Sequence, residues 1–297
     1  MMTGILVKAI AGFCYVECDG EIYECKPRGN LRKSGLYCGD SVEFSVLRQG
    51  KGVVEAVHLR KNSLVRPPIS NLDRLYIVSA HNTPAPNALL IDRITALCEK
   101  LNIEPIIVFN KSDLGSLKDW ANIYSACGYK TFVVSALEPQ SLSELKEHLL
   151  SFSGISAFTG NSGVGKSSIL NAVFPELSLQ TGSVSEKLGR GRHTTRQVEL
   201  FKLPAGGYIA DTPGFSSLDI TKCEVIFKEE LPHCFREFLP YTDQCRFHSC
   251  THLNEPDCAV KAAVLSGEIP KSRYESYCAL YDEVKDLKKW NTQKKTR

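Results

Sequence analysis

The residues best suited to chemistry are 160–168, which read Gly-Asn-Ser-Gly-Val-Gly-Lys-Ser-Ser. This spacing matches G-x-x-x-x-G-K-[ST], the loop in which backbone N–H groups surround nucleotide phosphates. Lys166 would reach the β- and γ-phosphates, and the Ser167 hydroxyl would bind Mg²⁺. A glycine-rich turn without a ligand is the alternative, but a predicted strand over 155–159 and a helix from 167 supply the context that the motif requires. The predicted nucleotide contacts here are Asn161, Ser162, Gly163, Val164, Gly165, Lys166, Ser167 and Ser168.

A second motif, Asn110-Lys111-Ser112-Asp113, follows an apolar run. An aspartate at the end of a strand can accept hydrogen bonds from N1–H and the 2-amino group of guanine, whereas adenine offers no such pair of donors. We therefore predict that Asp113 reads guanine, that Asn110 braces the loops and that the Lys111 stem lies over the purine. A solvated turn is the alternative for so short a motif. The next predicted strand ends in a second base-contacting loop, formed by Ser135 and Ala136.

A third motif, Asp-Thr-Pro-Gly at 211–214, follows the predicted strand 207–210. Asp211 would hold Mg²⁺ through water, and the Gly214 N–H would sense the γ-phosphate. The next residue is Phe215, where many GTPases carry the glutamine that orients the attacking water. An apolar side chain cannot orient water by hydrogen bonding. We therefore expect slow intrinsic hydrolysis and a partner that completes the site.

The order of the three motifs is permuted. In an ordinary small GTPase the phosphate loop comes first and the base-reading motif last, but here 110–113 precedes 160–168, which precedes Asp211. Circular permutation preserves such a site because the termini of a domain often lie close together. With these motifs the chain resembles, over essentially its whole length, the bacterial ribosome small-subunit-dependent GTPase A family. The resemblance implies an N-terminal OB-fold, a circularly permuted P-loop GTPase domain and a C-terminal zinc domain.

Residues 176–196 are too polar to order themselves, which suits a switch that orders when γ-phosphate binds. Residues 191–196, Gly-Arg-His-Thr-Thr-Arg, match the second motif of the family. By resemblance to related GTPases, Thr195 is the predicted threonine ligand of Mg²⁺, and Thr194 is the alternative. His193 is predicted to approach the attacking water, and a switch histidine that contacts RNA or nothing is the competing interpretation. The predicted catalytic residues are Lys166, His193 and Thr195.

Near the C-terminus, the pattern Cys-x4-Cys-x-His-x5-Cys places three cysteines and one histidine within 14 residues. Three thiolates and an imidazole are the composition of a closed structural zinc site, which has no open coordination position for catalysis. Buried thiols without a metal are the alternative, but the family resemblance falls on the same four positions. His248 is a competing ligand, less favoured because it lies within the loop between the first two cysteines. The predicted ligands are Cys245, Cys250, His252 and Cys258.

The first 67 residues alternate in hydrophobicity as β-strands do, and the pair Asp19-Gly20 predicts a hairpin. Five short strands in this length predict a small β-barrel of the OB-fold type. Basic residues crowd its connections, so we predict an RNA-facing surface, with a solvated face as the alternative. The predicted strands are 5–10, 13–18, 21–26, 41–47 and 52–58. The basic residues are Lys26, Arg28, Arg32, Lys33, Arg60, Lys61 and Arg66.

From residue 72, strands and helices alternate, which predicts a mostly parallel sheet with ligands at the carboxyl ends of its strands. Ser141 and Glu144 are predicted to form a capping box for a helix over 142–150. The other predicted elements are strands at 72–79, 105–109 and 131–135, and helices at 88–101, 117–127, 258–265 and 271–290. The predicted domains are an OB-fold barrel at 1–67, the permuted GTPase domain at 68–222 and a helical zinc domain at 223–297.

The composition limits which partners and which cellular compartment the sequence allows. Net charge is only +3 in 297 residues, so any surface for RNA must be locally basic. The chain lacks an apolar stretch of 18 residues and a signal-peptide pattern, which predicts a cytoplasmic protein without membrane contact. Twelve cysteines in such a chain are expected to be reduced thiols and metal ligands rather than disulfides.

We therefore predict an enzyme that hydrolyses GTP to GDP and phosphate, that is stimulated by the small ribosomal subunit, and that acts in late 30S maturation through rRNA binding. It is expected to be a monomer that uses Mg²⁺ with GTP and holds one structural Zn²⁺. Two alternatives stand beside this prediction. A nucleotide-gated RNA-binding module with incidental hydrolysis is favoured by Phe215, and a phosphotransferase is disfavoured by the switch motifs.

Overall fold

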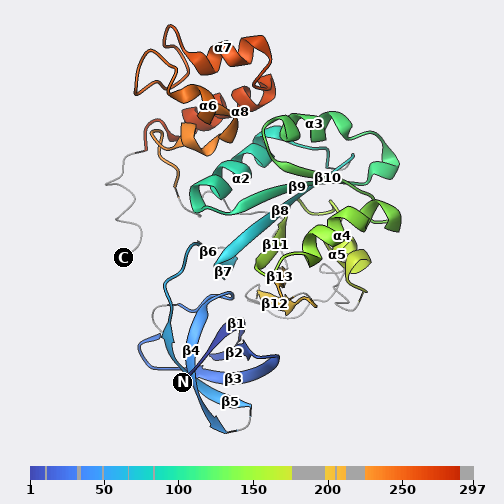
Figure 1. Ribbon diagram of the computed structural model, residues 1–297, viewed down its shortest axis with the longest axis vertical. Helices are drawn as coiled ribbons and strands as arrows, with labels where there is room; N and C mark the ends of the chain where they lie inside the picture. The colour runs from blue at the N-terminus through green and yellow to red at the C-terminus, as the bar shows by residue number, and fades with distance from the viewer. Residues whose placement is uncertain are drawn as a thin grey trace, which may run out of the picture.

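The computed structural model describes residues 1–297 apart from 11, 32–34, 49, 66, 83, 176–197, 205, 212–224 and 288–297, with Asp211 described by its backbone. Three parts follow one another along the longest axis (Figure 1). A β-barrel that contains the N-terminus lies at one end, a sheet flanked by helices lies in the middle, and a small helical region lies at the other end. Among the described residues, each helix is too short or too polar to cross a bilayer.

The N-terminal barrel has five strands, as predicted. Strand β1 pairs antiparallel with both β2 and β4, and β3 pairs parallel with β5, so the sheet closes on itself in the order β1-β2-β3-β5-β4-β1. Inward-facing side chains such as Leu6, Val16 and Phe44 are fully buried in its core. The strands are β1 (Met2–Ile10), β2 (Phe13–Cys18), β3 (Glu21–Pro27), β4 (Ser41–Arg48) and β5 (Lys51–Val57).

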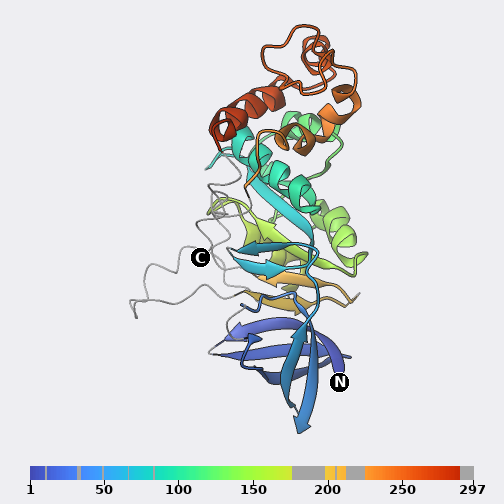
Figure 2. The ribbon, with the colours of Figure 1, turned by 90° about the vertical axis from the view of Figure 1, so that its left-hand side faces the viewer.

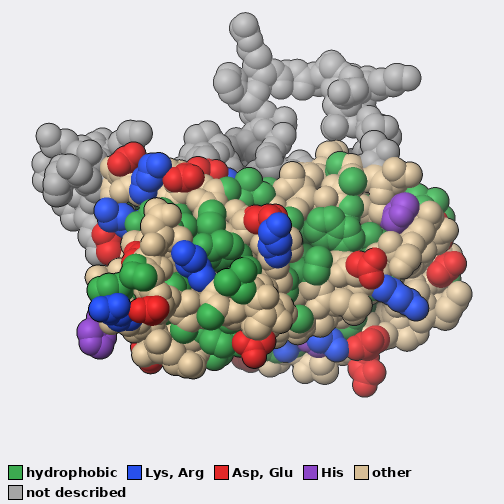
Figure 3. Space-filling view, turned by 90° about the horizontal axis from the view of Figure 1, so that it is seen from above, with side chains coloured by type: hydrophobic (Ala, Val, Ile, Leu, Met, Phe, Trp, Pro, Cys, Tyr) green, Lys and Arg blue, Asp and Glu red, His purple; other side chains and the backbone are tan. Residues whose placement is uncertain are grey.

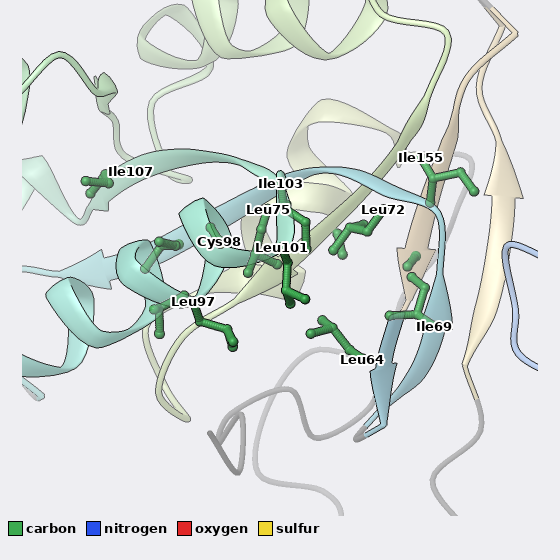
Figure 4. Close-up of a cluster of buried hydrophobic side chains, with 14 of the residues drawn as sticks. Leu64, Ile69, Leu72, Leu75, Leu97, Cys98, Leu101, Ile103, Ile107 and Ile155 are labelled. Atoms are coloured by element: carbon green, nitrogen blue, oxygen red, sulfur yellow. The ribbon is translucent and has the colours of Figure 1, made fainter. Parts of the chain in front are cut away.

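A short hairpin of β6 (Ser63–Val65) and β7 (Pro68–Ser70) joins the barrel to the middle of the molecule. Its buried Leu64 and Ile69 pack into the same apolar cluster as Leu72 and Leu101 (Figure 4). The connection is therefore packed against the central sheet rather than extended away from it.

The central sheet has the order β10-β9-β8-β11-β13-β12, in which β12 alone is antiparallel to its neighbour in this set. Successive side chains of a strand point to opposite faces. Leu75 and Ile77 thus pack beneath α2 and α3, while Tyr76 and Val78 pack beneath α4 and α5. The strands are β8 (Leu72–Ala80), β9 (Glu104–Asn110), β10 (Lys130–Val133), β11 (Ile155–Thr159), β12 (Glu199–Lys202) and β13 (Tyr208–Asp211). The helices are α2 (Ala88–Leu101), α3 (Lys118–Ala126), α4 (Ser143–Leu150) and α5 (Lys166–Val173).

The barrel and the central sheet are continuous. Strand β1 pairs with β12 at Lys8 and Glu199, so that barrel and central strands form one 11-stranded sheet. Figure 2 shows the β12–β13 hairpin lying directly between the barrel and the rest of the central sheet.

The C-terminal region packs against α2. Phe235, Phe238 and Tyr277 form its apolar centre, and Ala96 of α2 belongs to the same cluster. Gly267 ends α7 with a φ of +84°. Helix α8 ends at Val284 rather than at the predicted 290, because the Leu287 N–H turns back to the Val284 carbonyl. The helical segments are η6 (Leu231–Cys234), η7 (Arg236–Phe238), α6 (Leu239–Thr242), α7 (Ala259–Ser266) and α8 (Lys271–Val284).

Candidate nucleotide-binding site and metal cluster

Three loops meet at the carboxyl edge of the parallel strands, where an open α/β sheet binds its ligands. Residues 160–165 follow β11, residues 111–113 follow β9, and residues 135–136 follow β10. Strand order places β9 between β8 and β10, and β8 pairs with β11. The loops predicted to bind phosphate and base are thus brought to one side of the molecule.

Asn110 ties these loops together. Its Nδ2 donates to the Val164 carbonyl at 2.8 Å, and its Oδ1 accepts the Ala136 N–H at 3.1 Å. The side chain is only 2% exposed, so both bonds are shielded from water. Gly165 has a φ of +92°, and a Cβ on it would lie 2.3 Å from Asn110 Nδ2. Only glycine therefore fits between the phosphate loop and the side chain that braces it.

Asp113 is oriented by its neighbours. Ser135 Oγ donates to Asp113 Oδ1 at 2.5 Å, which leaves the second carboxylate oxygen for another donor. Ser135 is itself held by Ser141, whose hydroxyl accepts the Ser135 N–H at 2.9 Å. The predicted capping box is therefore wrong: α4 has no side-chain cap, because the Ser141 hydroxyl is committed to the Ser135 loop, and Glu144 pairs with Lys130.

Lys166 lies inside the phosphate loop. Its Nζ donates to the carbonyls of Gly160 and Asn161 at 2.7 and 2.9 Å, and burial lowers the pKa of this lysine to about 8. Ser167 and Ser168 lie in the first turn of α5, where backbone N–H groups and the helix dipole favour an anion. Lys111 follows Asn110 in a left-handed conformation with a φ of +63°.

The first turn of α2 borders the phosphate loop, a contact that the sequence did not predict. A small cavity lies between them, lined by Asn87 and Leu90 on one side and by Gly160 and Asn161 on the other. Asn87 caps α2 by accepting the Leu90 N–H at 3.0 Å. An asparagine directly before an apolar run is the signal that marks this start of α2 in the sequence.

The remaining predicted switch residues lie outside the part of the chain that the structure describes, apart from the backbone of Asp211. His193, Thr194, Thr195, Gly214 and Phe215 lie outside the described residues. The backbone of Asp211 ends β13, directly opposite Glu199 in the ladder with β12.

The C-terminal cysteines and histidine converge on one point. The ligand atoms of Cys245, Cys250, His252 and Cys258 all lie within 4.8 Å of one another, and His248 is not part of this group. His252 Nδ1 lies 3.6 Å from Cys245 Sγ and 3.4 Å from Cys258 Sγ, and these two sulfurs are 3.9 Å apart. Tetrahedral Zn²⁺ bonds of about 2.3 Å to sulfur and about 2.05 Å to nitrogen require S···S of about 3.8 Å and S···N of about 3.5 Å. The cluster thus fits a zinc ion.

Groups around the cluster hold its loop in place. Glu255 accepts the N–H groups of Thr251 and Leu253 at 2.7 and 3.1 Å, and hydrogen bonds lower the pKa of Glu255 to about 2 against the raising effect of burial. Tyr274 donates to the His252 carbonyl at 2.8 Å. The described cysteines outside the cluster are free thiols, as predicted.

The comparisons with known proteins agree with this architecture. Residues 57–221 match the family described as RsgA GTPase, and residues 3–54 match the family described as RsgA N-terminal domain. The chain belongs to the RsgA family of small ribosomal subunit biogenesis GTPases. It is therefore a GTP hydrolase, and the predicted family and fold class are confirmed.

Relatives align over nearly the whole chain. The Small ribosomal subunit biogenesis GTPase RsgA of Caldanaerobacter subterraneus subsp. tengcongensis is 44% identical over 293 residues, with 97% of each chain covered. The protein of the same name from Streptococcus pneumoniae is 44% identical over 293 residues, covering 96% of this chain and 95% of its own. The crystal structure of YjeQ from Thermotoga maritima has a TM-score of 0.81 at 38% identity and covers 97% of this chain and 99% of its own. That of YloQ, described as a circularly permuted GTPase, has a TM-score of 0.79 at 35% identity and covers 97% and 96%.

We predict that Lys166 makes GTP binding sensitive to pH. The phosphates favour the charged ammonium, so binding above the lysine pKa of about 8 requires uptake of a proton. We expect GTP affinity to be highest below this pKa and to fall by about tenfold between about pH 7 and pH 9. Titration calorimetry in buffers of different ionisation enthalpy measures both the affinity and the proton uptake. Lys166→Arg stays charged and should lose this slope, whereas an unchanged affinity of the natural protein across the range would contradict the prediction.

Removal of the metal should unfold the C-terminal region. Structural Zn²⁺ contributes about 10–16 kcal/mol of apparent binding energy, which exceeds the stability of most small domains. We expect one Zn²⁺ per chain, and we expect a chelator or Cys258→Ser to abolish hydrogen-exchange protection in α7 and α8 while the barrel stays protected. Cys278→Ser is the matched control, because this half-buried thiol lies outside the cluster. Retained protection in a preparation shown to lack zinc would contradict a structural metal.

Proposed function

We propose that this GTPase hydrolyses GTP in response to the small ribosomal subunit during late maturation of that subunit in the cytoplasm. The observation that carries the proposal is the bracing of the phosphate loop and a base loop by the single buried side chain of Asn110. Such bracing prepares one site for both ends of a guanine nucleotide. The names of the relatives supply the assignment to the small subunit.

In this proposal each predicted residue has a distinct role. Asp113 accepts hydrogen bonds from guanine with the oxygen that Ser135 leaves available, and Lys166 exchanges its two loop carbonyls for phosphate oxygens. Mg²⁺ would supply charge neutralisation at the β- and γ-phosphates. Three residues would hold the ion: Ser167, Thr195 and, through water, Asp211. Because Phe215 cannot orient water, the ribosomal particle completes the site.

We propose domain boundaries of 1–67, 68–222 and 223–297, with the first and last domains gripping rRNA on either side of a monomeric GTPase. In the barrel, the Arg28 side chain is 69% exposed and that of Lys51 is 49% exposed, which leaves both accessible to phosphates. Figure 3 looks onto the C-terminal region, where positive and negative side chains are interspersed. Contact there would depend on shape and exposed apolar groups such as Leu265 more than on net charge.

Hydrolysis would release the particle by way of α2. The first turn of this helix borders the phosphate loop, and its buried Asp92 binds Arg273 of α8 at 2.5 Å. A shift of the phosphate loop on loss of γ-phosphate would therefore reach the C-terminal region through one rigid element. This route supplements the chain connection from Asp211 into residue 223 and beyond.

Retention of the protein on small subunits tests this function. We expect co-sedimentation to persist with a non-hydrolysable GTP analogue and to decay with GTP at the rate of phosphate release. A GDP-loaded sample should bind weakly from the start. Equal release with GTP and with the analogue would instead support the alternative, a nucleotide-gated RNA-binding module with incidental hydrolysis.

A further inference from the structure

The barrel forms hydrogen bonds with the β12–β13 hairpin, which ends at Asp211. Glu17 on β2 of the barrel accepts a hydrogen bond from Lys202 Nζ at 2.5 Å and another from the Tyr208 hydroxyl. Lys202 and Tyr208 are direct partners in the β12–β13 ladder. One barrel carboxylate thus holds both strands of the hairpin.

Burial and hydrogen bonds hold the Glu17 side chain in place. Its side chain is 8% exposed, and its Oε1 also accepts the Gly20 N–H from the β2–β3 turn at 2.8 Å. Burial alone would raise the pKa of Glu17, but the hydrogen bonds from Lys202, Tyr208 and Gly20 outweigh it and keep the pKa below its usual value. The carboxylate is therefore charged at neutral pH, and hydrogen bonds to a charged, shielded group are the strong ones.

Other described contacts at this edge of the hairpin are a buried bond from Cys38 Sγ to the Val198 carbonyl at 3.1 Å, a short backbone ladder and an exposed ion pair. The backbone ladder with the barrel has Lys8 opposite Glu199 as its pair. The Lys8–Glu199 ion pair is 2.7 Å long but its side chains are 31% and 40% exposed, so it contributes little. On the other edge, β13 pairs with β11, the strand that leads into the phosphate loop. Among these described polar contacts, Glu17 is the one that reaches both strands of the hairpin from the barrel side.

We infer that Glu17 is a positioning residue for the GTPase site: by joining Lys202 to Tyr208, it fixes the strand that ends at Asp211. Tyr208 begins β13 and Asp211 ends it, so a displaced Tyr208 displaces the whole short strand. The inference rests on the proposed role of Asp211 in holding Mg²⁺. A barrel that contacts RNA would thereby also set the geometry of the magnesium site.

The test measures how much Mg²⁺ strengthens GTP binding. The affinity for a fluorescent GTP analogue is measured without ribosomes, once with excess Mg²⁺ and once with excess EDTA. The ratio of the affinity with Mg²⁺ to the affinity with EDTA reports how much the ion contributes to binding. Glu17→Ala and Tyr208→Phe should each lower the ratio by roughly three- to tenfold, the usual range for a residue that couples two sites. Glu17→Gln can still accept from Tyr208 and should recover part of the loss.

Three comparisons make the result decisive. Glu24→Gln removes an ion pair of the same barrel, with Lys51 at 3.3 Å, without touching the hairpin, and it should leave the ratio unchanged. Tyr208→Phe keeps the ring in place and remains informative if Glu17→Ala fails to fold. If Asp211→Asn lowers the ratio but Glu17→Ala and Tyr208→Phe do not, the positioning role is refuted while the proposed magnesium role stands. If Asp211→Asn leaves the ratio intact, the proposed magnesium role of Asp211 fails and the inference fails with it.

Discussion

Asp113→Asn should change the base that the enzyme selects from guanine to xanthine. Ser135 Oγ donates to Asp113 Oδ1, so the amide of an asparagine here would keep its oxygen toward Ser135 and turn its NH₂ toward the base. Guanine presents donors at that edge and would meet a donor, whereas xanthine presents an oxygen in place of the 2-amino group. The loss of two hydrogen bonds to a charged group should weaken GTP binding on the order of 10³-fold.

Competition binding with GTP and XTP measures this switch. We expect the variant to bind XTP more tightly than GTP, with an unchanged melting temperature. Asp119→Asn is the matched control, because this residue lies in the exposed first turn of α3 close to the same loop. GTP affinity within a few-fold of the natural protein would mean that Asp113 does not read the base.

Arg273→Met should detach α8 from α2. The Arg273 side chain is 1% exposed, and it binds Asp92 at 2.5 Å and both carboxylate oxygens of Glu237 at 2.6 and 3.2 Å. Its guanidinium also lies 4.7 Å from the ring centre of Phe235. Methionine would leave two buried carboxylates without their cation, which costs about 3–5 kcal/mol.

The loss of stability caused by Arg273→Met should depend on pH. Burial raises the pKa of Asp92 even beside Arg273, and removal of the arginine would raise it further. The protonated acid would then be the stable buried form, so the deficit should be smallest in acid and should grow as pH rises through the pKa of Asp92 in the folded variant.

Hydrogen exchange of the α8 amides measures this change locally, since a chain of several domains need not unfold in one step. Arg28→Met removes a barrel arginine that is 69% exposed and should change local stability by less than about 1 kcal/mol. Unaltered α8 protection in Arg273→Met at neutral pH would show that the buried ion pairs do not hold the two elements together.

Local patterns in the sequence predicted most individual elements. Helix α2 has the predicted ends at residues 88 and 101, and β2 has its predicted ends at 13 and 18. In both cases the signal is local: an apolar period for α2, and the Asp19-Gly20 turn after β2. The metal cluster was likewise predictable, because its four ligands are close in sequence and are all cysteine or histidine, the residue types that bind zinc.

Contacts between distant segments were not predictable. Glu17 and Lys202 are 185 positions apart, and Asp92 and Arg273 are 181 apart. Charged residues are usually exposed, so composition gives no reason to bury Glu17, Asp92 or Arg273. The capping-box error has a related cause: a serine hydroxyl can bond to a helix or to a neighbouring loop, and the sequence does not state which partner lies within reach.

The central claim is that the small ribosomal subunit completes this GTPase site, and phosphate release from GTP tests it most directly. The purified protein is assayed with and without small subunits, with ATP as the control nucleotide. We predict stimulation of GTP hydrolysis by roughly 10²-fold or more, as expected when a partner supplies a missing transition-state contact, and no response with ATP. Fast hydrolysis without subunits would contradict the claim, and so would tight GTP binding with no turnover in either condition.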